Sequence, residues 1–322
     1  MDSEISIIMP AYNLEEYIAS SIMSVQQQTF TNWQLLVIDD GSTDMTSKIV
    51  SDVAEKDCRI QLLRQENGGS ASARNAGLDI ARGKYIAFLD GDDLWEPTFL
   101  DRLLAAVHEA NVEMAYCGYS HLYTMGITTK FSYPYVSGDI LAGVIRGSTQ
   151  VHIGCLLVEK AVIERYAIRF TEGCLIGQDQ EFIIKLVSVV KVQTVPKELM
   201  KYRIRMGSAI NSEWNWKKHI HAIWGLKRAA NAVAAQNSGA ERASRLALLF
   251  EQRISYKVFK FIWRMIKKGY QADALQLLNK EFVHDISHID VGALKLTDKM
   301  KYRIVHSKNL RLWKFISHLK FI

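Results

Sequence analysis

Residues 34–44 read QLLVIDDGSTD and residues 84–95 read KYIAFLDGDDLW. Each stretch is a short apolar run that ends in carboxylates and a glycine, which is typical of a buried strand that leads into a turn. ISIIM (5–9) and IQLLR (60–64) are two further strand-like runs. Helical patterns follow the four runs, over residues 17–27, 44–54, 71–81 and 98–110. This alternation predicts an α/β fold in which helices cover a parallel sheet.

The remainder of the chain divides into a mixed part and a helical part. A helix is expected to start near Gln180, where apolar residues recur at helical spacing. Beyond Trp214 the patterns are long and helical, with a break at QNSGA (236–240). We therefore expect one domain over residues 1–214 and a helical C-terminal extension over residues 215–322. Three strand-like runs lie in the mixed part: MAYCGYSHLY (114–123), CLLVEK (155–160) and KELMKYRIR (197–205).

Composition limits the class of protein. Of the 322 residues, 48% are hydrophobic and 23% are charged, which is close to globular averages and excludes global disorder. No apolar run is long enough to span a membrane, and the acidic start MDSEISIIMP lacks the basic region of a secretory signal, so we expect a cytoplasmic protein. The four cysteines show neither a disulfide framework nor zinc-ligand spacing.

The net charge of +6 conceals two opposite parts. Residues 215–322 hold 21 Lys and Arg against 7 Asp and Glu, whereas residues 1–214 hold 19 against 27. In the stretches 253–270 and 300–322, cations alternate with aromatic and aliphatic residues, which is typical of a helix that lies on an anionic membrane. The alternative is an ordinary amphipathic helix that packs on its own domain. No nucleic-acid-binding module is visible, so no nucleic-acid partner is expected.

The residues after the first two strands are candidates for ligand binding, because ligands of such sheets bind at the carboxyl ends of the strands. Pro10-Ala11-Tyr12-Asn13 follows the first run, and Pro10 is expected to end the strand there. Asp39 and Asp40 follow the second run, and Ser42 or Thr43 is expected to cap the next helix. Capping does not account for two adjacent carboxylates, which need a donor such as a nucleobase N–H, an arginine or a metal ion.

The third strand leads into Asn67-Gly68-Gly69-Ser70, a glycine turn that opens a helix. Such a turn lets a ligand approach the backbone, and Arg74 in the first turns of the helix could bind a phosphate bidentately. The alternative is a glycine turn with a solvated surface arginine. Neither the GxGxxG pattern nor the GxxxxGK[ST] pattern is present.

Asp90-Gly91-Asp92-Asp93 follows the fourth strand and is the strongest local signal. Three carboxylates in four residues are costly next to a buried run unless a cation neutralises them. Hard oxygen ligands favour Mg²⁺ or Mn²⁺, which complete their shell with substrate phosphates. The run therefore predicts a site for a nucleoside diphosphate and a metal ion, with a plain acidic turn as the alternative.

Five stretches of the sequence together resemble the family 2 glycosyltransferases. They are ISIIMPAYN, QTF with Trp33, LLVIDDGSTD, NGGSASARNAG and YIAFLDGDDLWEP. These are inverting enzymes of the GT-A fold, a Rossmann-like mixed sheet, which use nucleotide-diphospho-sugars. The resemblance is dense over about residues 4–118 and thinner to about 212. It implies a nucleotide-sugar-binding half over 1–118 and an acceptor half, which also holds the general base, over 119–214.

The resemblance also implies roles for single residues. Tyr12 would stack on the nucleobase, Asp40 would accept from a uracil-type N–H, and Arg74 would contact the nucleotide. Asp92 would ligate Mn²⁺ or Mg²⁺, with Asp90 directed to the ribose and metal region and Asp93 as a less certain helper. The remaining residues counted as nucleotide-binding are Pro10, Ala11, Gly69 and Gly91.

The segment Gly177-Gln178-Asp179 resembles the family's Gly-Glu-Asp motif. It implies that Asp179 is the general base, while Gln178 departs from the usual glutamate. Arg205 stands where the family often has a histidine in a segment that folds over the donor. Because arginine is not a normal metal ligand, Arg205 is expected to bind the diphosphate directly.

The predicted activity is single-displacement, metal-dependent transfer of a sugar, by a hexosyl- or N-acetylhexosaminyltransferase, from a UDP-sugar to a hydroxyl of a glycan or lipid-linked glycan. Polysaccharide, O-antigen or capsule synthesis at the inner face of the membrane would fit this activity. Oligomers of the chain are possible. A nucleotide-sugar-binding scaffold without turnover is the main alternative, and a nucleotidyltransferase is a third. The single histidines His108, His121 and His152 are given no role. The aromatics that could stack on sugar rings are Trp95, Tyr119, Trp214 and Trp216.

Overall fold

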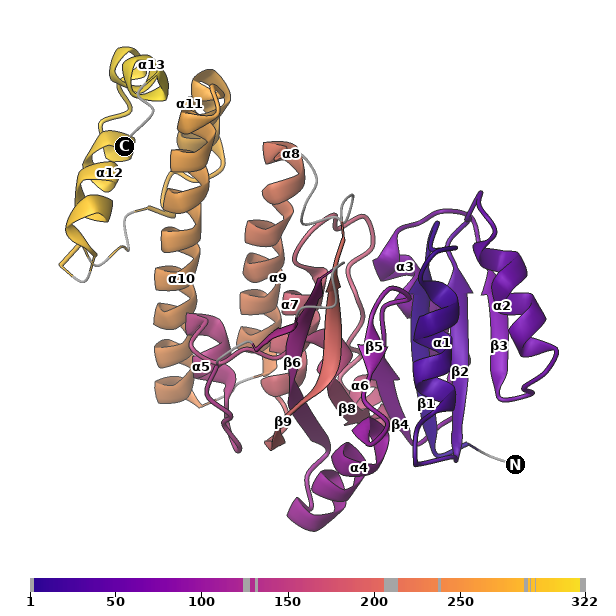
Figure 1. Cartoon of the computed structure of the whole chain (residues 1–322). Helices are drawn as coiled ribbons and strands as arrows, with labels where there is room; N and C mark the ends of the chain where they lie inside the picture. The colour runs from indigo at the N-terminus through magenta and orange to yellow at the C-terminus, as the bar shows by residue number, and fades with distance from the viewer. Residues whose placement is uncertain are drawn as a thin grey trace. The chain divides into compact units, whose positions relative to one another are not determined.

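A computed structural model describes residues 3–123, 128–130, 133–205, 214–236, 239–286, 289, 291–292 and 294–318. The chain forms two compact units, Met1–Glu213 and Trp214–Ile322 (Figure 1). All four cysteines are free thiols, as expected; Cys58 is exposed and the other three are buried. In the described part of the chain no helix is long and apolar enough to cross a membrane.

The first unit is built on one mixed sheet with the strand order β3-β2-β1-β4-β8-β6-β9-β5, and β7 pairs with β6. The four runs at the start of the chain form the parallel part, as predicted, because β1 pairs with β2 and β4, and β2 with β3. The later strands add the antiparallel β8 and β5. The strands are β1 Ile5–Ala11, β2 Trp33–Asp39, β3 Ile60–Arg64, β4 Tyr85–Phe88, β5 Leu94–Trp95, β6 Met114–Tyr123, β7 Thr128–Lys130, β8 Leu156–Glu159 and β9 Val192–Ile204.

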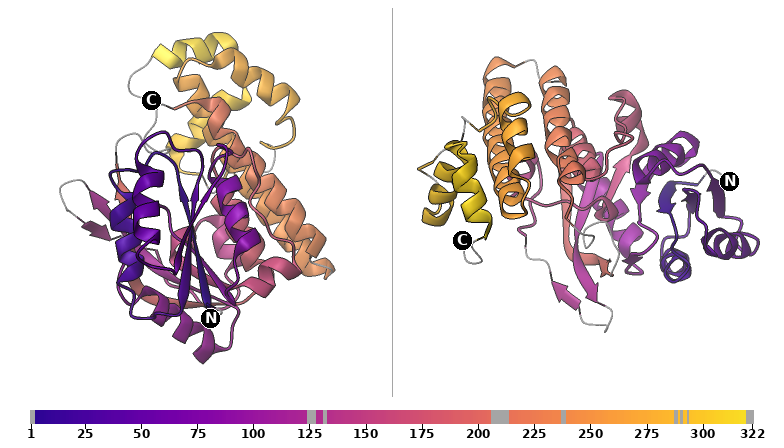
Figure 2. Two further views of the ribbon diagram at one scale, coloured as in Figure 1. Left: turned by 90° about the vertical axis from the view of Figure 1, so that its right-hand side faces the viewer. Right: turned by 90° about the horizontal axis from the view of Figure 1, so that it is seen from above.

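Helices cover both faces of this sheet (Figure 2). Ile5, Ile7 and Met9 of β1 share one buried cluster with apolar residues of α1, α2 and α4. On the other face α3 packs on β1 and β2, and Phe88 of β4 contacts Phe182 of α7 with ring centroids 5.6 Å apart. Every residue of β1 and β2 is buried because both faces are covered. The helices are α1 Ile18–Gln26, α2 Thr46–Ala54, α3 Ser70–Ile80, α4 Phe99–Ala110, α5 Leu141–Arg146, α6 Lys160–Arg165 and α7 Gln178–Val187.

Three predicted element ends differ from the structure by a few residues. Pro10 lies inside β1 and pairs with Ile38; β4 pairs with β1 only as far as Ile8, so the missing N–H of Pro10 breaks no bond to β4. The helix α2 starts at Thr46 and not after Ser42 or Thr43, because the Asp44 carboxylate accepts the Thr46 N–H at 2.9 Å. The helix α7 begins at Gln178, two residues before the expected start, which puts Asp179 in its first turn.

The second unit is helical, as predicted, and α10 packs against each of the other helices. Residues 237–238 of the predicted break lie outside the described residues, and α9 and α10 end and begin on either side of it. In the 253–270 stretch the aromatic side chains Phe259, Phe261 and Trp263 are buried, so packing within the unit explains them. The helices are α8 Trp216–His219, α9 His221–Gln236, α10 Ala240–Lys267, α11 Gln271–Lys280, α12 Leu296–His306 and α13 Leu310–His318.

Candidate functional site

The parallel strands bring the predicted acidic residues to one edge of the sheet. β1 and β2 run in register to Ala11 and Asp39, and β4 ends at Phe88, two residues before Asp90. The N-terminal ends of α3 and α7 meet at the same edge, where Gln178 Nε2 donates to Ser70 Oγ. The candidate site therefore lies where the fold class predicts it, at the carboxyl ends of the strands.

Arg74 joins the two halves of the site. Its side chain is 2% exposed, its Nη2 lies 2.5 Å from Asp90 Oδ1, and its Nη1 lies 2.8 Å from Asp179 Oδ1. The guanidinium also lies 5.3 Å from the ring centre of Phe170. The alternative of a solvated surface arginine is therefore wrong. In this structure Arg74 fixes the positions of two carboxylates that are 89 residues apart in the chain.

The carboxylate of Asp179 combines a fixed position with access for a substrate. Its side chain is 40% exposed, and Oδ1 accepts from Arg74. Burial raises its pKa, Arg74 opposes this shift, and the negative charge of Asp90 adds to it. In the described part of the chain no donor lies within hydrogen-bond distance of Oδ2. Oδ2 is thus available to accept a proton.

Asp40 holds the glycine turn before α3. Oδ1 accepts from Gly68 N at 2.9 Å and from Gln65 Nε2 at 2.8 Å, and Oδ2 accepts from Gly69 N at 2.8 Å. The residue is 3% exposed. The predicted partners were a nucleobase N–H, an arginine or a metal ion, whereas in the structure Gln65 and the backbone of Gly68 and Gly69 supply the donors. Because a carboxylate offers about four acceptor positions, one on Oδ2 remains for a ligand.

Gly69 begins α3 with φ 84° and ψ 165°, a backbone region that other residues rarely adopt. Its N–H can therefore reach Asp40 at the turn. Tyr12 follows β1 and is 47% exposed, so its ring is accessible to a ligand. Asp39, in contrast, is fully buried and accepts from Ser42 N at 2.9 Å and from Ser47 Oγ, which gives it a structural role.

The acidic run after β4 meets Arg203 near the end of β9 and Arg205 just after it. Arg205 Nε lies 2.6 Å from Asp92 Oδ2, and Arg203 Nε donates to the Asp92 carbonyl at 2.7 Å. Both guanidinium groups lie near the ring of Tyr17, at 5.3 Å and 5.2 Å from its centre. The sequence predicted that a cation neutralises the three crowded carboxylates. In the structure Arg205 provides part of this positive charge, at Asp92. Arg203 and Tyr17 were missed because neither belongs to a strand-end motif.

Asp93 is the most buried member of the run, at 1% exposed. Oδ1 accepts from Arg203 N at 2.9 Å, and Oδ2 has no partner among the residues that the structure describes. Burial raises the pKa of Asp93 well above its ordinary value, and Asp92 and Asp90 add repulsion. Burial, with Asp90, also raises the pKa of Asp92, while Arg205 lowers it. A neutral, protonated Asp93 would remove one of three crowded charges.

Gly91 fits tightly between the carboxylates and α1. A Cβ at this position would lie 2.8 Å from Leu14 Cδ1 and 2.9 Å from Ile18 Cδ1. Its carbonyl accepts from Ser21 Oγ at 2.9 Å. The Asp-Gly-Asp spacing therefore lets the turn pack closely on α1.

A divalent metal ion fits the carboxylates in part. Among the described residues no group of three or more His, Cys, Asp and Glu side chains is placed to hold a metal. Asp90 and Asp92 nevertheless offer hard oxygen atoms, and each is engaged by an arginine through one oxygen only. This donor set suits Mg²⁺ or Mn²⁺ that takes its other ligands from phosphate and water.

Several aromatic residues near the site were not given a role from the sequence. His121 and His152 form ring contacts with Tyr119 and Tyr202, whereas His108 bonds to Tyr85 on another part of the sheet. The long-range pairing of β6 with β9 brings these rings together, and no local pattern could show it. Of the aromatics named as sugar-stacking candidates, Trp95 is 4% exposed and stacks on Phe99 in the core.

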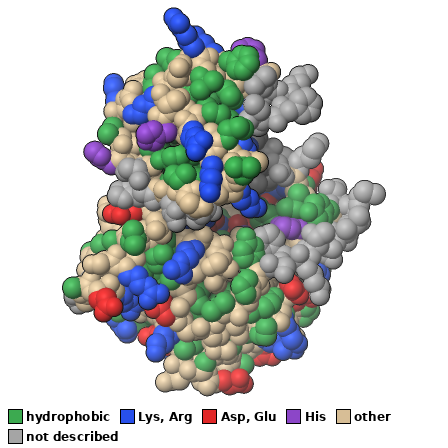
Figure 3. All heavy atoms as spheres, turned by 90° about the vertical axis from the view of Figure 1, so that its left-hand side faces the viewer, with side chains coloured by type: hydrophobic (Ala, Val, Ile, Leu, Met, Phe, Trp, Pro, Cys, Tyr) green, Lys and Arg blue, Asp and Glu red, His purple; other side chains and the backbone are tan. Residues whose placement is uncertain are grey.

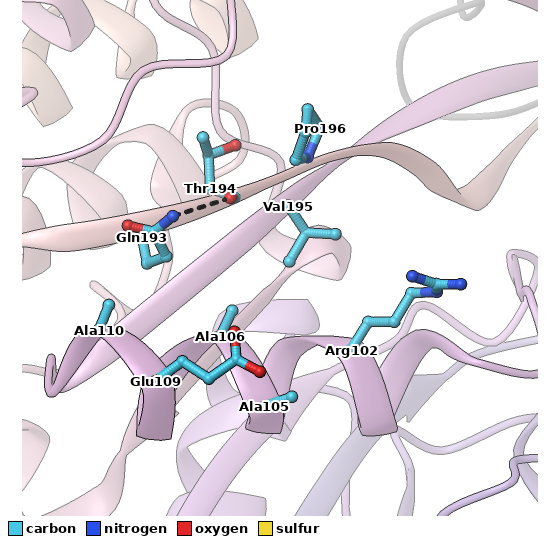
Figure 4. A pocket seen from close by; sticks show the side chains of 9 residues that line it. All are labelled: Arg102, Ala105, Ala106, Glu109, Ala110, Gln193, Thr194, Val195 and Pro196. Carbon is cyan, nitrogen blue, oxygen red and sulfur yellow. Dashed lines mark hydrogen bonds between the residues drawn. The ribbon is translucent and has the colours of Figure 1, made fainter.

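A separate groove of about 460 Å³ lies between the C-terminal half of α4 and the first residues of β9. Figure 4 shows Arg102 and Glu109 on its α4 side and Gln193, which donates to the Thr194 carbonyl, on its β9 side. The site arginine Arg203 lies at the other end of β9, and Arg205 follows that end. The groove is therefore not part of the candidate site.

Solved structures support this architecture. The structure of residues 1–349 of S. aureus TarS in complex with UDP-GlcNAc has a TM-score of 0.77 and 18% identity, and covers 98% of this chain and 90% of that chain. This likeness identifies the GT-A fold, here followed by a helical C-terminal region.

Curated sequence relatives share a higher sequence identity with the chain than this solved structure does. An uncharacterized glycosyltransferase from Haemophilus influenzae is 33% identical over 221 residues, which are 68% of this chain and 85% of that protein. The Escherichia coli UDP-Glc:alpha-D-GlcNAc-diphosphoundecaprenol beta-1,3-glucosyltransferase WfgD is 42% identical over 134 residues, 41% of this chain and 52% of that protein. In other curated relatives the match spans 33–34% of their length. The family description "Glycosyl transferase family 2" matches residues 6–155, and the chain belongs to this family.

Proposed function

We propose that the chain is an inverting glycosyltransferase that moves a sugar from a UDP-sugar to a hydroxyl of a glycan acceptor. The observation that carries this proposal is Arg74, which pairs with Asp90 at 2.5 Å and with Asp179 at 2.8 Å and so brings the proposed donor-side carboxylate and the proposed base together. WfgD is named as a glucosyltransferase of a diphosphoundecaprenol-linked sugar, and TuaG from Bacillus subtilis as a putative teichuronic acid biosynthesis glycosyltransferase, and these names favour polysaccharide, O-antigen or capsule synthesis as the setting.

The proposed reaction is a single displacement at the anomeric carbon. The acceptor hydroxyl attacks and gives its proton to Asp179 Oδ2, and the bond from the sugar to the UDP oxygen breaks, with its electron pair going to the leaving diphosphate. The raised pKa of Asp179 suits this task, because a general base works best when its pKa approaches the working pH. Arg74 keeps the carboxylate oriented throughout.

The nucleotide would lie between Tyr12, Asp40, Gly69 and the acidic run. Pro10 and Ala11 form the strand end beneath it, and Gly91 lets the run approach. Asp92 and Asp90 would hold Mn²⁺ or Mg²⁺, which would neutralise charge on the departing diphosphate. Arg205 would exchange its contact with Asp92 for one with the diphosphate when the donor binds.

The proposed function is tested by UDP release from a panel of UDP-sugars, with and without a chelator and with and without added glycans. We expect metal-dependent release that rises with an acceptor. Binding of UDP-sugar without any release would favour the alternative of a scaffold protein. Absence of both binding and release would refute the proposed donor.

We further propose that the second unit docks on an anionic membrane to reach a lipid-linked acceptor. Leu296, Met300 and Arg303 lie at helical spacing on α12 and are exposed. Arg311, Lys314 and Phe315 likewise lie at helical spacing on α13 and are exposed, and 64% of Phe315 is exposed. Figure 3 shows Lys, Arg and hydrophobic side chains mixed on one face of the molecule. This mixture is typical of a helix at a lipid surface.

A further inference from the structure

Four ring side chains gather where β6 and β9 run side by side. His121 pairs in register with Tyr202, and their ring centroids are 5.9 Å apart. Tyr119 lies 5.6 Å from His121, and His152 lies 5.1 Å from Tyr119 and 5.4 Å from Tyr202. We call these four residues the ring cluster. Tyr119 is buried, whereas His121, His152 and Tyr202 are partly exposed and form the accessible part.

The ring cluster adjoins the acidic side of the candidate site. Tyr202 directly precedes Arg203, whose N–H and Nε bond to Asp93 and to the Asp92 carbonyl. His152 accepts from Gly154 N, and the Gly154 carbonyl accepts from Trp95 Nε1, just beyond the acidic run. Burial lowers the pKa of His152, and the negative charges of Asp90 and Asp179 oppose this shift.

His152 is held as a neutral hydrogen-bond donor. Its Nδ1 accepts from Gly154 N at 3.1 Å, so the proton of the neutral ring lies on Nε2. Burial lowers the pKa of His152, which keeps the ring neutral. In the described part of the chain Nε2 has no acceptor within hydrogen-bond distance. The N–H is therefore available to a ligand.

The position of the ring cluster separates it from the expected nucleobase pocket. Tyr12 and Asp40 follow β1 and β2, whereas three of the four cluster residues stand on β6 and β9 and His152 lies in the segment before β8. In the sheet, β4 and β8 lie between these two pairs of strands. The acidic run after β4 thus has the expected nucleobase pocket on one side and the ring cluster on the other.

Aromatic faces beside one fixed N–H donor match a sugar ring, which offers an apolar C–H face and hydroxyl acceptors. We propose that the ring cluster is the acceptor subsite, in which a pyranose ring packs on Tyr202 and His121 while His152 Nε2 donates to one of its hydroxyls. This proposal rests on the proposed function. It assigns acceptor specificity to β6, β9 and the segment before β8.

Substitutions at two positions, Tyr202 and His152, separate recognition of the acceptor from simple packing. Tyr202→Ala removes a ring face, and Tyr202→Phe keeps it. His152→Asn keeps an acceptor for Gly154 N but removes the donor at the Nε2 position. Tyr166→Ala is the matched control, because Tyr166 is 37% exposed and stands at the end of α6, outside the ring cluster.

The first readout compares the rate of UDP release with and without an acceptor. The acceptors are methyl glycosides of glucose, galactose or N-acetylglucosamine, and the readout is the ratio of the two rates. We expect this ratio to fall by about tenfold in Tyr202→Ala and His152→Asn, consistent with about 1.4 kcal/mol for one ring contact or hydrogen bond. Tyr202→Phe and Tyr166→Ala should keep the wild-type ratio. Equal ratios in Tyr202→Ala and the wild type would overturn the proposal.

The second readout is saturation-transfer NMR of the same methyl glycosides with the full chain, which needs no turnover. Transfer to the glycoside that is lost in Tyr202→Ala and kept in Tyr166→Ala supports the acceptor subsite. No transfer from the wild type, together with no stimulation of UDP release, overturns it. Transfer without any UDP release in the wild type would keep the subsite and refute the proposed transferase function instead.

Discussion

At the scale of single residues, the site depends on the way in which Arg74 is buried. Removing one partner of a buried ion pair leaves an uncompensated charge, whose cost exceeds the worth of the pair itself. Asp90 and Asp179 keep 27% and 40% of their side chains exposed, so solvent offsets part of that cost. Arg74 therefore acts first as a structural link between two acidic segments.

Replacement of Arg74 by glutamine should lower the free energy of unfolding by about 2 kcal/mol or more. The matched control is Arg169→Gln, because Arg169 pairs with Asp79 on the surface, where 43% and 63% of the side chains are exposed. This control should stay within about 0.5 kcal/mol of the wild type. Urea unfolding measures both, and equal losses would show that Arg74 is not an essential link.

The pH dependence of turnover should report Asp179. The base must be deprotonated to act, so kcat/KM falls as the pH drops through its pKa. Because burial raises this pKa above the ordinary value of 3.8, the acid limb should lie above that value. A rate profile with saturating metal measures the limb. An acid limb at or below the ordinary value would contradict the assigned environment.

At the scale of elements, the glycine turn before α3 depends on a backbone conformation that glycine adopts readily and other residues rarely adopt. Gly69 has φ 84°, whereas Gly239 before α10 has φ −80°. In the described part of the chain no atom lies within 4 Å of the place that a Cβ would take at either glycine. Gly69→Ala should therefore cost about 1–3 kcal/mol through backbone strain alone. Gly239→Ala should change the stability by about 0.5 kcal/mol at most. Thermal unfolding compares them, and equal effects would refute the argument from backbone conformation.

The strands were predictable because their signal is local. A sheet that is covered on both faces requires apolar runs between turn residues. The sequence contains four such runs: ISIIM, QLLVID, IQLLR and KYIAFLD. The start of α7 was misplaced because Gly177, with φ 89°, begins the helix earlier than the apolar periodicity does. Pro10 is tolerated inside β1 because β1 pairs with β4 only as far as Ile8. This limit depends on the register of the two strands, which cannot be predicted from the sequence.

The acidic positions of the candidate site were predictable for the same reason, since they follow strands. Their partners were not. Asp40 takes its donors from the turn at Gly68 and Gly69, Asp92 meets Arg205, and Arg74 reaches Asp179 across 105 positions of the chain. The ring cluster depends on contacts between β6 and β9. The metal site, the roles of the nucleotide-binding residues and the boundary between donor and acceptor halves stay predictions.

At the scale of the whole molecule, the two units differ in charge, with the basic excess confined to residues 215–322. Of the two stretches predicted to bind membrane, 253–270 is explained by packing in the second unit. α12 and α13 keep exposed apolar residues beside cations, and Leu296 is 83% exposed. Any membrane contact should therefore use these two helices.

Sedimentation with vesicles tests this contact. We expect binding to phosphatidylglycerol vesicles and not to phosphatidylcholine vesicles, with loss at high salt. Arg311→Glu with Lys314→Glu should weaken binding by about tenfold or more, at roughly 1 kcal/mol for each cation. Lys56→Glu with Lys197→Glu, both exposed in the first unit, is the control with the same charge change. Equal weakening by both pairs would mean that net charge, not this surface, drives binding.

The central claim is that Asp179 is the base of a sugar transfer whose donor is held by the opposite half of the site. The most direct test is Asp179→Asn, in which the amide oxygen can still accept from Arg74 Nη1. UDP release with an acceptor should fall by about 10²-fold or more, while calorimetric affinity for UDP stays near that of the wild type. Turnover at the wild-type rate would contradict the account.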